Sequence, residues 1–162
     1  MLRFFVATLV VLTFPGCVGK HPFKQVQLCL DDQSSVDLFI QTMKEVSVAN
    51  GMKFTDRSAE TNKELAALNA KPDYEVMNIS ARRNDGVGWA AGNTGLSAFE
   101  VSIGFGHAPN LTAAHEFANV AIKALEEKWR VYDVPQGQGA LPRCIEQKPN
   151  NSFKPTPLRG AA

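Results

Sequence analysis

Residues 98–106, AFEVSIGFG, and residues 110–129, NLTAAHEFANVAIKALEEKW, decide the fold because they change period within one short connection. In the first stretch, apolar residues at every second position alternate with Glu, Ser and Gly, which indicates a strand with one buried face. In the second stretch, Asn110 has the character of a helix N-cap. The apolar stripe that follows it has helical spacing: Leu111, Ala114, Ala118, Ala121, Ile122, Leu125 and Trp129. A strand followed directly by an amphipathic helix predicts an α+β domain.

The neighbouring residues show the same two periods. A strand is expected at 26–31, and Asp32 or Ser34 can cap a helix that ends at Asn50 and Gly51. Thr61 and Glu64 have capping-box spacing in an expected short helix. The remaining expected elements are a short extended piece at 52–56, that short helix at 59–69 bearing Leu65 and Leu68, a strand at 74–83 and a last strand at 130–134.

This order of elements fits a split βαβ (ferredoxin-like) antiparallel sheet with helices on one face. The strands at 74–83 and 98–106 are expected to form a hairpin, joined by the long glycine-rich connection NDGVGWAAGNTG at 84–95. In this topology the first and last strands are neighbours. The chain leading to Cys144 therefore passes close to Cys29.

The N-terminus has the features of an export signal. Arg3 precedes an apolar run from Phe4 to Leu12, which is too short to span a bilayer. Gly16-Cys17 resembles the lipobox of small bacterial lipoproteins, although Phe14 stands where that family usually has Leu. The resemblance implies cleavage before Cys17, lipidation of Cys17 and a place in the cell envelope, on its periplasmic side. Ordinary cleavage nearby, giving a soluble periplasmic or secreted protein, is the alternative.

The chain is accordingly divided into four parts. Residues 1–16 are the expected signal peptide, 17–24 a tether, 25–145 a single domain and 146–162 a disordered tail. Within the tail, NNSFKPTPLRG resembles a translated repeat that recurs on unrelated predicted bacterial proteins. Neither resemblance extends over residues 25–145.

Three cysteines are too few for a disulfide scaffold. If Cys17 carries lipid, Cys29 and Cys144 remain, and two thiols in an exported protein most simply form one disulfide. A reactive or metal-binding thiol is the alternative, but the sequence has no CxxC motif and no histidine close to either cysteine.

The charges argue against a nucleic-acid partner. The chain has 17 basic and 16 acidic side chains, whereas nucleic-acid binders usually have a strong basic excess. Between residues 25 and 145 there are 11 basic and 15 acidic side chains, which leaves a charge of −4. The uneven distribution is typical of solvated tails on an ordinary domain.

The connection from Gly104 to Glu116 is one candidate site. It contains His107, Asn110 and His115 beside a helix N-terminus, which can bind an anion. A metal- or anion-dependent ligand binder or an enzyme could use this turn. HEFAN lacks the second histidine of HExxH, so no metal centre and no cofactor are expected. Hydrogen-bonded boundary histidines are the alternative interpretation.

Trp89 lies in the glycine-rich connection at 84–95. An exposed Trp in a mobile loop could anchor a partner or lie in a membrane interface. Alternatively, Trp89 folds back over the sheet.

The residues favour an exported, lipid-anchored, non-enzymatic binding module. Its partner is expected to be an envelope protein, bound through the sheet face or the Trp89 connection, as in small inhibitors, immunity proteins and assembly factors. This rests on location and size. A structural role in the envelope is a third possibility.

Overall fold

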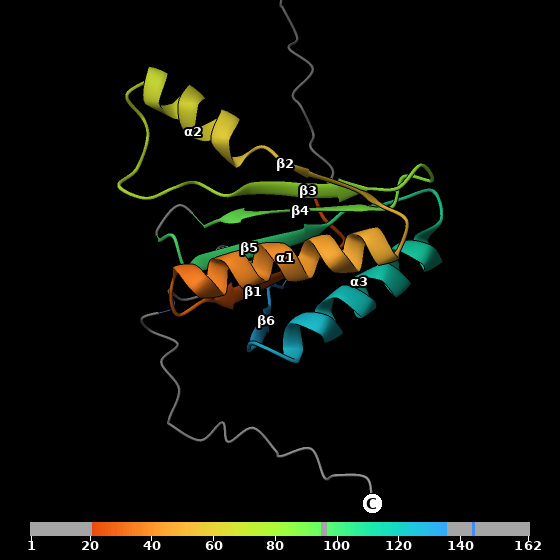
Figure 1. Ribbon diagram of the computed structural model, residues 1–162. Helices are drawn as coiled ribbons and strands as arrows, with labels where there is room; N and C mark the ends of the chain where they lie inside the picture. The colour runs from red at the N-terminus through yellow and green to blue at the C-terminus, as the bar shows by residue number, and fades with distance from the viewer. Residues whose placement is uncertain (1–20, 95–96, 136–143, 145–162) are drawn as a thin grey trace, which may run out of the picture.

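A computed structural model of the protein describes residues 21–94, 97–135 and 144. It shows an α+β fold with three helices and a six-stranded antiparallel sheet (Figure 1). The strands lie in the order β2-β3-β4-β5-β1-β6. In chain order the elements are β1 (Lys24–Cys29), α1 (Gln33–Ala49), β2 (Lys53–Asp56), α2 (Ser58–Ala67), β3 (Asn78–Arg82), β4 (Gly88–Asn93), β5 (Glu100–Phe105), α3 (Leu111–Glu126) and β6 (Val131–Asp133).

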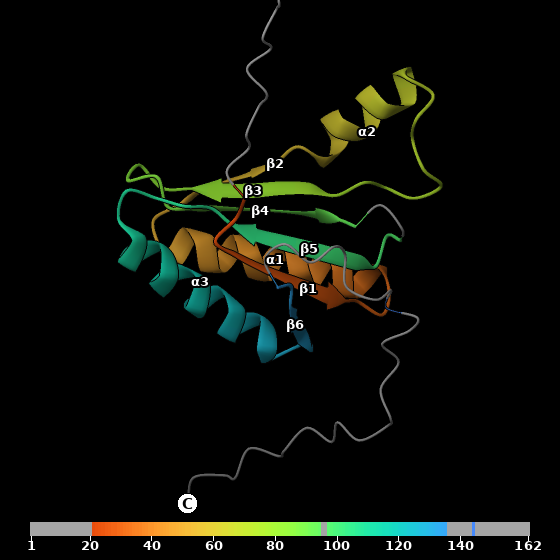
Figure 2. The ribbon, with the colours of Figure 1, turned by 180° about the vertical axis from the view of Figure 1, so that it is seen from behind.

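One face of the sheet is covered by α1 and α3, as the views from front and back show (Figures 1 and 2). The inward-facing positions of the strands are apolar, and Val26, Val101 and Ile103 are fully buried between sheet and helices. From α1 and α3, Phe39 and Leu125 close the core from the other side. The expected α+β class, with helices over one face, is confirmed.

The first and last strands are neighbours, as expected. β1 pairs with β6 on one side, where Gln27 lies opposite Tyr132, and with β5 on the other, where Gln27 lies opposite Ser102. The expected N-caps of α1 and α3, Asp32 and Asn110, are also confirmed. The Asp32 carboxylate accepts a hydrogen bond from the Ser35 amide (2.8 Å), and the Asn110 side chain accepts one from the Ala113 amide (3.0 Å).

The prediction of a long hairpin connection at 84–95 is wrong, because this stretch contains β4. β4 pairs with β3 on one side and β5 on the other, so it lies inside the sheet. The turn that precedes it needs Gly86, whose φ of +92° is strained for other residues. Gly92 is needed for close packing, since an added Cβ would lie 2.9 Å from the Met77 carbonyl oxygen.

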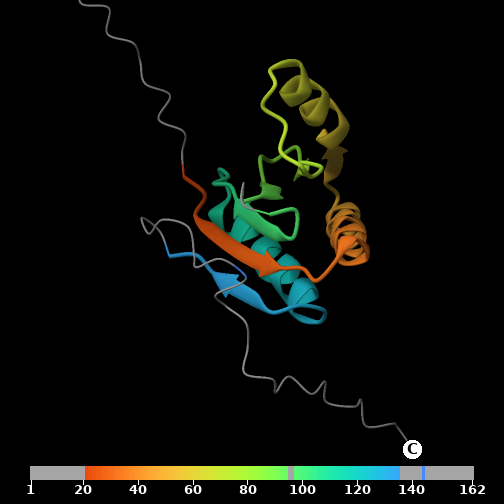
Figure 3. The same cartoon turned by 90° about the vertical axis from the view of Figure 1, so that its left-hand side faces the viewer.

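The second helix also differs from its prediction. α2 begins at Ser58 and its N-cap is Arg57, so Thr61 is not its N-cap. The Asp56 carboxylate accepts a hydrogen bond from the Ser58 amide (2.9 Å). The buried residue of α2 is Asn62, which hydrogen-bonds both the amide and the carbonyl of Val76. Leu68 is 75% exposed. A polar contact, in place of the expected leucine face, therefore holds α2, which stands away from the sheet beyond β2 (Figure 3).

Within residues 21–94 and 97–135, none of the helices combines the length and the apolar character that a membrane crossing requires.

Candidate functional site

The face of the sheet opposite α1 and α3 carries small and polar side chains. Because side chains alternate along a strand, the residues on either side of each core-facing residue point to this face. Phe54 contacts Trp89 on the helix side (ring centroids 6.1 Å apart), so its neighbours Lys53 and Thr55 point to the open side. We call this side of the sheet the open face. Its residues are Gln25 on β1, Ser102 and Gly104 on β5, Ala90 and Gly92 on β4, Asn78, Ser80 and Arg82 on β3, and Lys53 and Thr55 on β2. Gln27 of β1 points to the same side but is only 3% exposed.

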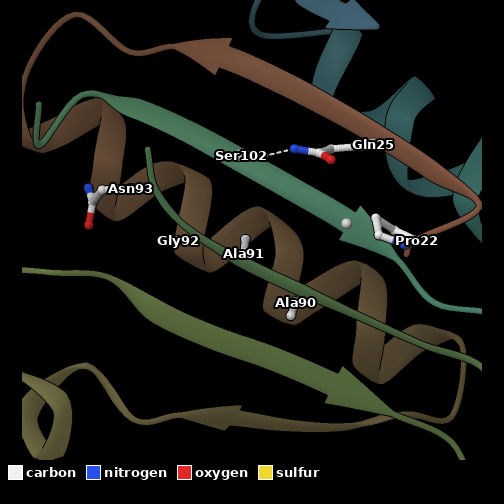
Figure 4. A pocket seen from close by; sticks show the side chains of 8 residues that line it. Pro22, Gln25, Ala90, Ala91, Gly92, Asn93 and Ser102 are labelled. Atoms are coloured by element: carbon white, nitrogen blue, oxygen red, sulfur yellow. Dashed lines mark hydrogen bonds between the residues drawn. The ribbon is translucent and has the colours of Figure 1, made fainter. Parts of the chain in front are cut away.

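A shallow hollow of about 300 Å³ lies over β4 and β5 on this face. Figure 4 shows it from the open side, with α1 behind the strands. Its floor is low because Ala90, Gly92 and Gly104 have almost no side chain. Gln25 closes one side, and its amide donates a hydrogen bond to the Ser102 hydroxyl (2.8 Å; Figure 4).

A second hollow of about 460 Å³ adjoins the first and shares Pro22, Ala90 and Gly104 with it. We refer to the two hollows together as the trough. The second hollow is lined by three polar side chains: Ser80, Arg82 and His107. Glycines supply much of the remaining wall: Gly86, Gly88, Gly104 and Gly106. The trough thus runs from an amide and hydroxyl pair at one end to a guanidinium and an imidazole at the other.

Two cations face each other at the Arg82 end of the trough. Lys53 lies directly opposite Arg82 in the pairing of β2 with β3. Both side chains are exposed, and neither makes an ion pair or side-chain hydrogen bond with another residue in the described part of the chain. Like charges at directly opposed positions of an antiparallel pair repel each other. This end of the open face is therefore an uncompensated cationic site.

The other described arginines already have partners. Arg57 is paired with Glu60 (2.7 Å), and the Arg130 guanidinium stacks over the Tyr132 ring at 5.0 Å. Arg83 is paired with Asp85 (2.7 Å), and this hydrogen bond holds the pKa of the Asp85 carboxyl below its usual range. Arg82 differs from these three.

The Cys29 end of the open face is closed by a disulfide. Cys29 and Cys144 are bonded, with Cα atoms 5.5 Å apart, which confirms the expected pair. The Glu100 carboxylate lies beneath, only 3% exposed, and accepts hydrogen bonds from the Cys144 amide (2.9 Å) and the Thr94 hydroxyl (3.0 Å). Among the described residues of this face, the acidic side chain is thus buried and hydrogen-bonded, and the exposed charged side chains, Lys53 and Arg82, are positive.

The candidate residues of the 104–116 connection do not form one site. His107 lines the trough, whereas Asn110 caps α3 through its side chain. His115 is exposed on α3 and packs against Phe23 (centroids 4.3 Å), which also contacts the His107 ring (5.7 Å). The two histidines therefore meet around an aromatic ring. Among the described residues no group of three or more metal-ligating side chains comes together.

Trp89 is not an exposed loop residue, so the premise of its predicted role as a partner anchor is wrong. It belongs to β4 and is 4% exposed. Its indole N–H donates to the Ser47 hydroxyl on α1 (2.9 Å), and its ring contacts Phe54. The indole is therefore buried between β4 and α1. Trp89 thus joins the sheet to α1.

The sequence analysis did not single out Ser80, Lys53 or Arg82 as site residues. Their proximity depends on the register between β2, β3 and β4. The alternation NISAR in β3 was the one signal that could have assigned Ser80 and Arg82 to a common face. Cys17 and the expected signal, tether start and tail lie outside the described residues.

Comparison of the chain with protein-family models, curated proteins and solved structures gives no match. The case for a function therefore depends on the open face itself.

Proposed function

We propose that the protein is an exported bacterial lipoprotein, anchored through Cys17, which acts as a non-enzymatic binding module for an envelope protein. The trough on the open sheet face is its binding surface, and the bound segment of the partner is acidic. The observation that carries the proposal is the asymmetry of the sheet. One face is covered by two helices, and the other presents a shallow trough of small and polar residues.

The shape of the face supports a macromolecular partner. An antiparallel sheet can leave one face to solvent, but such a face usually carries long polar side chains. Here Ala90, Gly92 and Gly104 leave the backbone of the central strands close to the surface. Low relief over three strands suits a broad contact better than the enclosure of a small molecule, which generally needs a deep concave site.

Charge complementarity supports an acidic partner. Within the described part of the chain, the exposed charges of the open face come from Lys53 and Arg82, and the acid of this face, Glu100, is buried and hydrogen-bonded. Complementary charge across an interface fixes orientation and excludes wrong partners. A partner segment with carboxylates would neutralise the two cations.

The test is capture from the native envelope, followed by measurement of affinity for the captured protein. Ala90→Glu places an acid on the floor of the trough, and Val120→Glu places the same charge on the exposed surface of α3, where Val120 is 48% exposed. We expect Ala90→Glu to weaken binding at least tenfold and Val120→Glu to leave it unchanged. If both variants bind as the unmodified protein does, the trough is not the binding surface.

The envelope address has its own test. The intact mass of the protein from the membrane fraction of the native host should correspond to a chain that begins at lipidated Cys17. Cys29 and Cys144 should resist alkylation until the protein is reduced, because they are bonded. An unlipidated mass would exclude the lipid anchor and leave a soluble, exported protein.

The topology is also proposed to be an expanded ferredoxin-like arrangement. β5 and β6 flank β1 and are joined through α3, as a split βαβ unit requires. β1 and β2 are joined through α1 and enclose β5, β4 and β3. The hairpin of β3 and β4 is the expansion, and it supplies most of the trough.

A further inference from the structure

We infer that Lys53, Arg82 and the adjoining hollow form a carboxylate-binding subsite, in which Arg82 holds the carboxylate in a bidentate pair. The inference rests on the proposed function and assigns the acidic chemistry of the partner to one place. Its ligand is a carboxylate from a protein, either an acidic side chain or a chain terminus.

The position of Arg82 suits it to bind a ligand in the hollow. Its side chain begins at the end of β3 and passes over Gly88, where an added Cβ would lie 3.5 Å from the Arg82 Cγ. Arg82 also lines the 460 Å³ hollow, together with Ser80 and His107. Because β4 has no side chain at Gly88, the arginine can lie against the sheet and still reach the hollow. A planar guanidinium in this position presents parallel N–H donors to a carboxylate.

Lys53 and Arg82 repel each other in the free protein, which favours an anion between them. Directly opposed cations on neighbouring strands are unfavourable, and neither side chain has an acidic partner among the described residues. A carboxylate placed between them would remove the repulsion and gain two ion pairs. The free protein is thus prepared for an anion at the point where its own residues leave charge uncompensated.

A carboxylate suits this hollow better than a phosphate. Phosphate sites typically use free backbone amides. Two amides of this hollow are already bonded, because the Gly86 amide donates to the Arg83 carbonyl (3.0 Å) and the Gly106 amide to the Gly88 carbonyl (3.0 Å). Of the side-chain donors at the hollow, the Arg82 guanidinium is the one suited to a planar ligand. Ser80 can add a hydroxyl donor at the edge of the hollow.

The experiment uses the purified full chain with Cys17→Ser and follows the Arg82 Nε–H and His107 ring signals by NMR during titration. Four probes are added separately: acetyl-tetraglutamate amide, acetyl-tetraglycine with a free C-terminus, acetyl-tetralysine amide and inorganic phosphate. We expect saturable shifts with tetraglutamate when the source is a side chain, and with tetraglycine when the source is a terminus. Shifts with phosphate alone, or with no probe, would overturn the inference.

Matched variants separate a subsite from general attraction. Arg82→Gln and Arg130→Gln remove the same charge, but Arg130 stacks on Tyr132 at the far edge of the sheet. Arg82→Gln should lower the affinity for the carboxylate peptide at least tenfold, whereas Arg130→Gln should change this affinity less than twofold. Equal losses in the two variants would show that net charge alone attracts the peptide.

A charge-reversed variant gives an independent readout. Lys53→Glu should raise the melting temperature of the free protein, because the opposed pair becomes attractive, and should also weaken tetraglutamate binding. A lower melting temperature with unchanged binding would contradict the subsite. If Arg82→Gln binds the carboxylate peptide as tightly as the unmodified protein does, while Ala90→Glu still weakens binding of the partner, the trough stands as the binding surface and only the carboxylate subsite is wrong.

Discussion

The hydrogen bond between Trp89 and Ser47 links the sheet to α1, and we predict how much unfolding free energy is lost when it is removed. Ser47 is fully buried, and its hydroxyl donates to the Met43 carbonyl (2.6 Å) while it accepts the Trp89 indole N–H (2.9 Å). Ser47→Ala leaves the indole donor buried without an acceptor, which costs about 1–3 kcal/mol. Alanine returns roughly 0.5 kcal/mol through its higher helix propensity. The expected net loss of unfolding free energy is therefore about 0.5–2.5 kcal/mol.

For a domain of about 120 residues, 1 kcal/mol shifts the melting temperature by about 4 °C, so the expected fall is roughly 2–10 °C. The assay is urea unfolding followed by far-UV circular dichroism, so that changes at the tryptophan do not alter the signal. In a Trp89→Phe background the indole donor is absent, and Ser47→Ala should then cost about 1 kcal/mol less. The difference between the two backgrounds measures the buried hydrogen bond.

Thr42 provides the matched control on the same helix. It is 6% exposed, and its hydroxyl also donates to a carbonyl four residues earlier (Leu38, 2.7 Å). No described side chain donates to it. Thr42→Val should therefore change stability by less than about 0.5 kcal/mol, because no buried donor is orphaned. If Ser47→Ala costs the same with and without the indole, the assigned role of Trp89 is refuted.

The remaining predictions concern the ends of the fold and its pH response. Replacing Cys29 and Cys144 by Ala should lower the unfolding free energy by about 5 kcal/mol in the chain-entropy account, since the bond joins residues 115 apart; urea unfolding showing a loss below about 1 kcal/mol would contradict it. Asn110→Ala should cost about 1 kcal/mol through loss of the α3 cap, and Asn110→Asp should retain the cap; thermal unfolding of both variants checks this. The hydrogen bond from Arg83 lowers the pKa of Asp85 in the folded protein. The ion pair therefore stabilises the fold above the unfolded pKa of about 3.9, and this stabilisation is lost as the pH falls through the lower folded pKa. The melting temperatures of the unmodified protein and Asp85→Asn should therefore differ at pH 7 and converge in strong acid; a gap that persists there would assign the effect to packing.

The strand and helix at 98–129 could be predicted because every local signal there agrees. β5 alternates strictly, and Asn110 caps the helix that the apolar stripe indicates. Local propensity, burial pattern and capping favour the same elements, and the tertiary contacts agree with these local preferences. The disulfide could be predicted for a related reason, since few cysteines leave few pairings.

β4 could not be predicted, because its sequence carries no local strand signal. Glycine and alanine are poor strand formers, so the stretch around Gly88, Ala90 and Gly92 is typical of a loop. Pairing with β3 on one side and β5 on the other overrides this weak preference. The error moved Trp89 from the core to the surface and hid the trough, because the same small residues that disguise the strand form its floor.

The candidate site depends on register, which local sequence patterns do not encode. Lys53 and Arg82 are far apart in the chain and become opposed only when β2 pairs with β3. The repulsion between these two cations also destabilises the fold. Sequence patterns that assume each residue stabilises the fold fail most often at functional sites. A sequence argument built on agreement between signals finds the elements of the core. It does not find a pair of residues that the fold holds together against their own repulsion.

The net charge of the domain predicts how salt should affect carboxylate binding at Arg82. Residues 25–145 carry −4 overall, while the exposed charges on the open face are positive. An acidic peptide is thus repelled by the domain at long range and attracted by Lys53 and Arg82 at contact. Salt screens the long-range repulsion strongly, since the Debye length is about 10 Å at 0.1 M, and it screens close pairs less. Raising the ionic strength from low to physiological values should therefore change the affinity for tetraglutamate less than about threefold. A fall of tenfold or more would mean that diffuse attraction, and not a pair of opposed cations, holds the peptide.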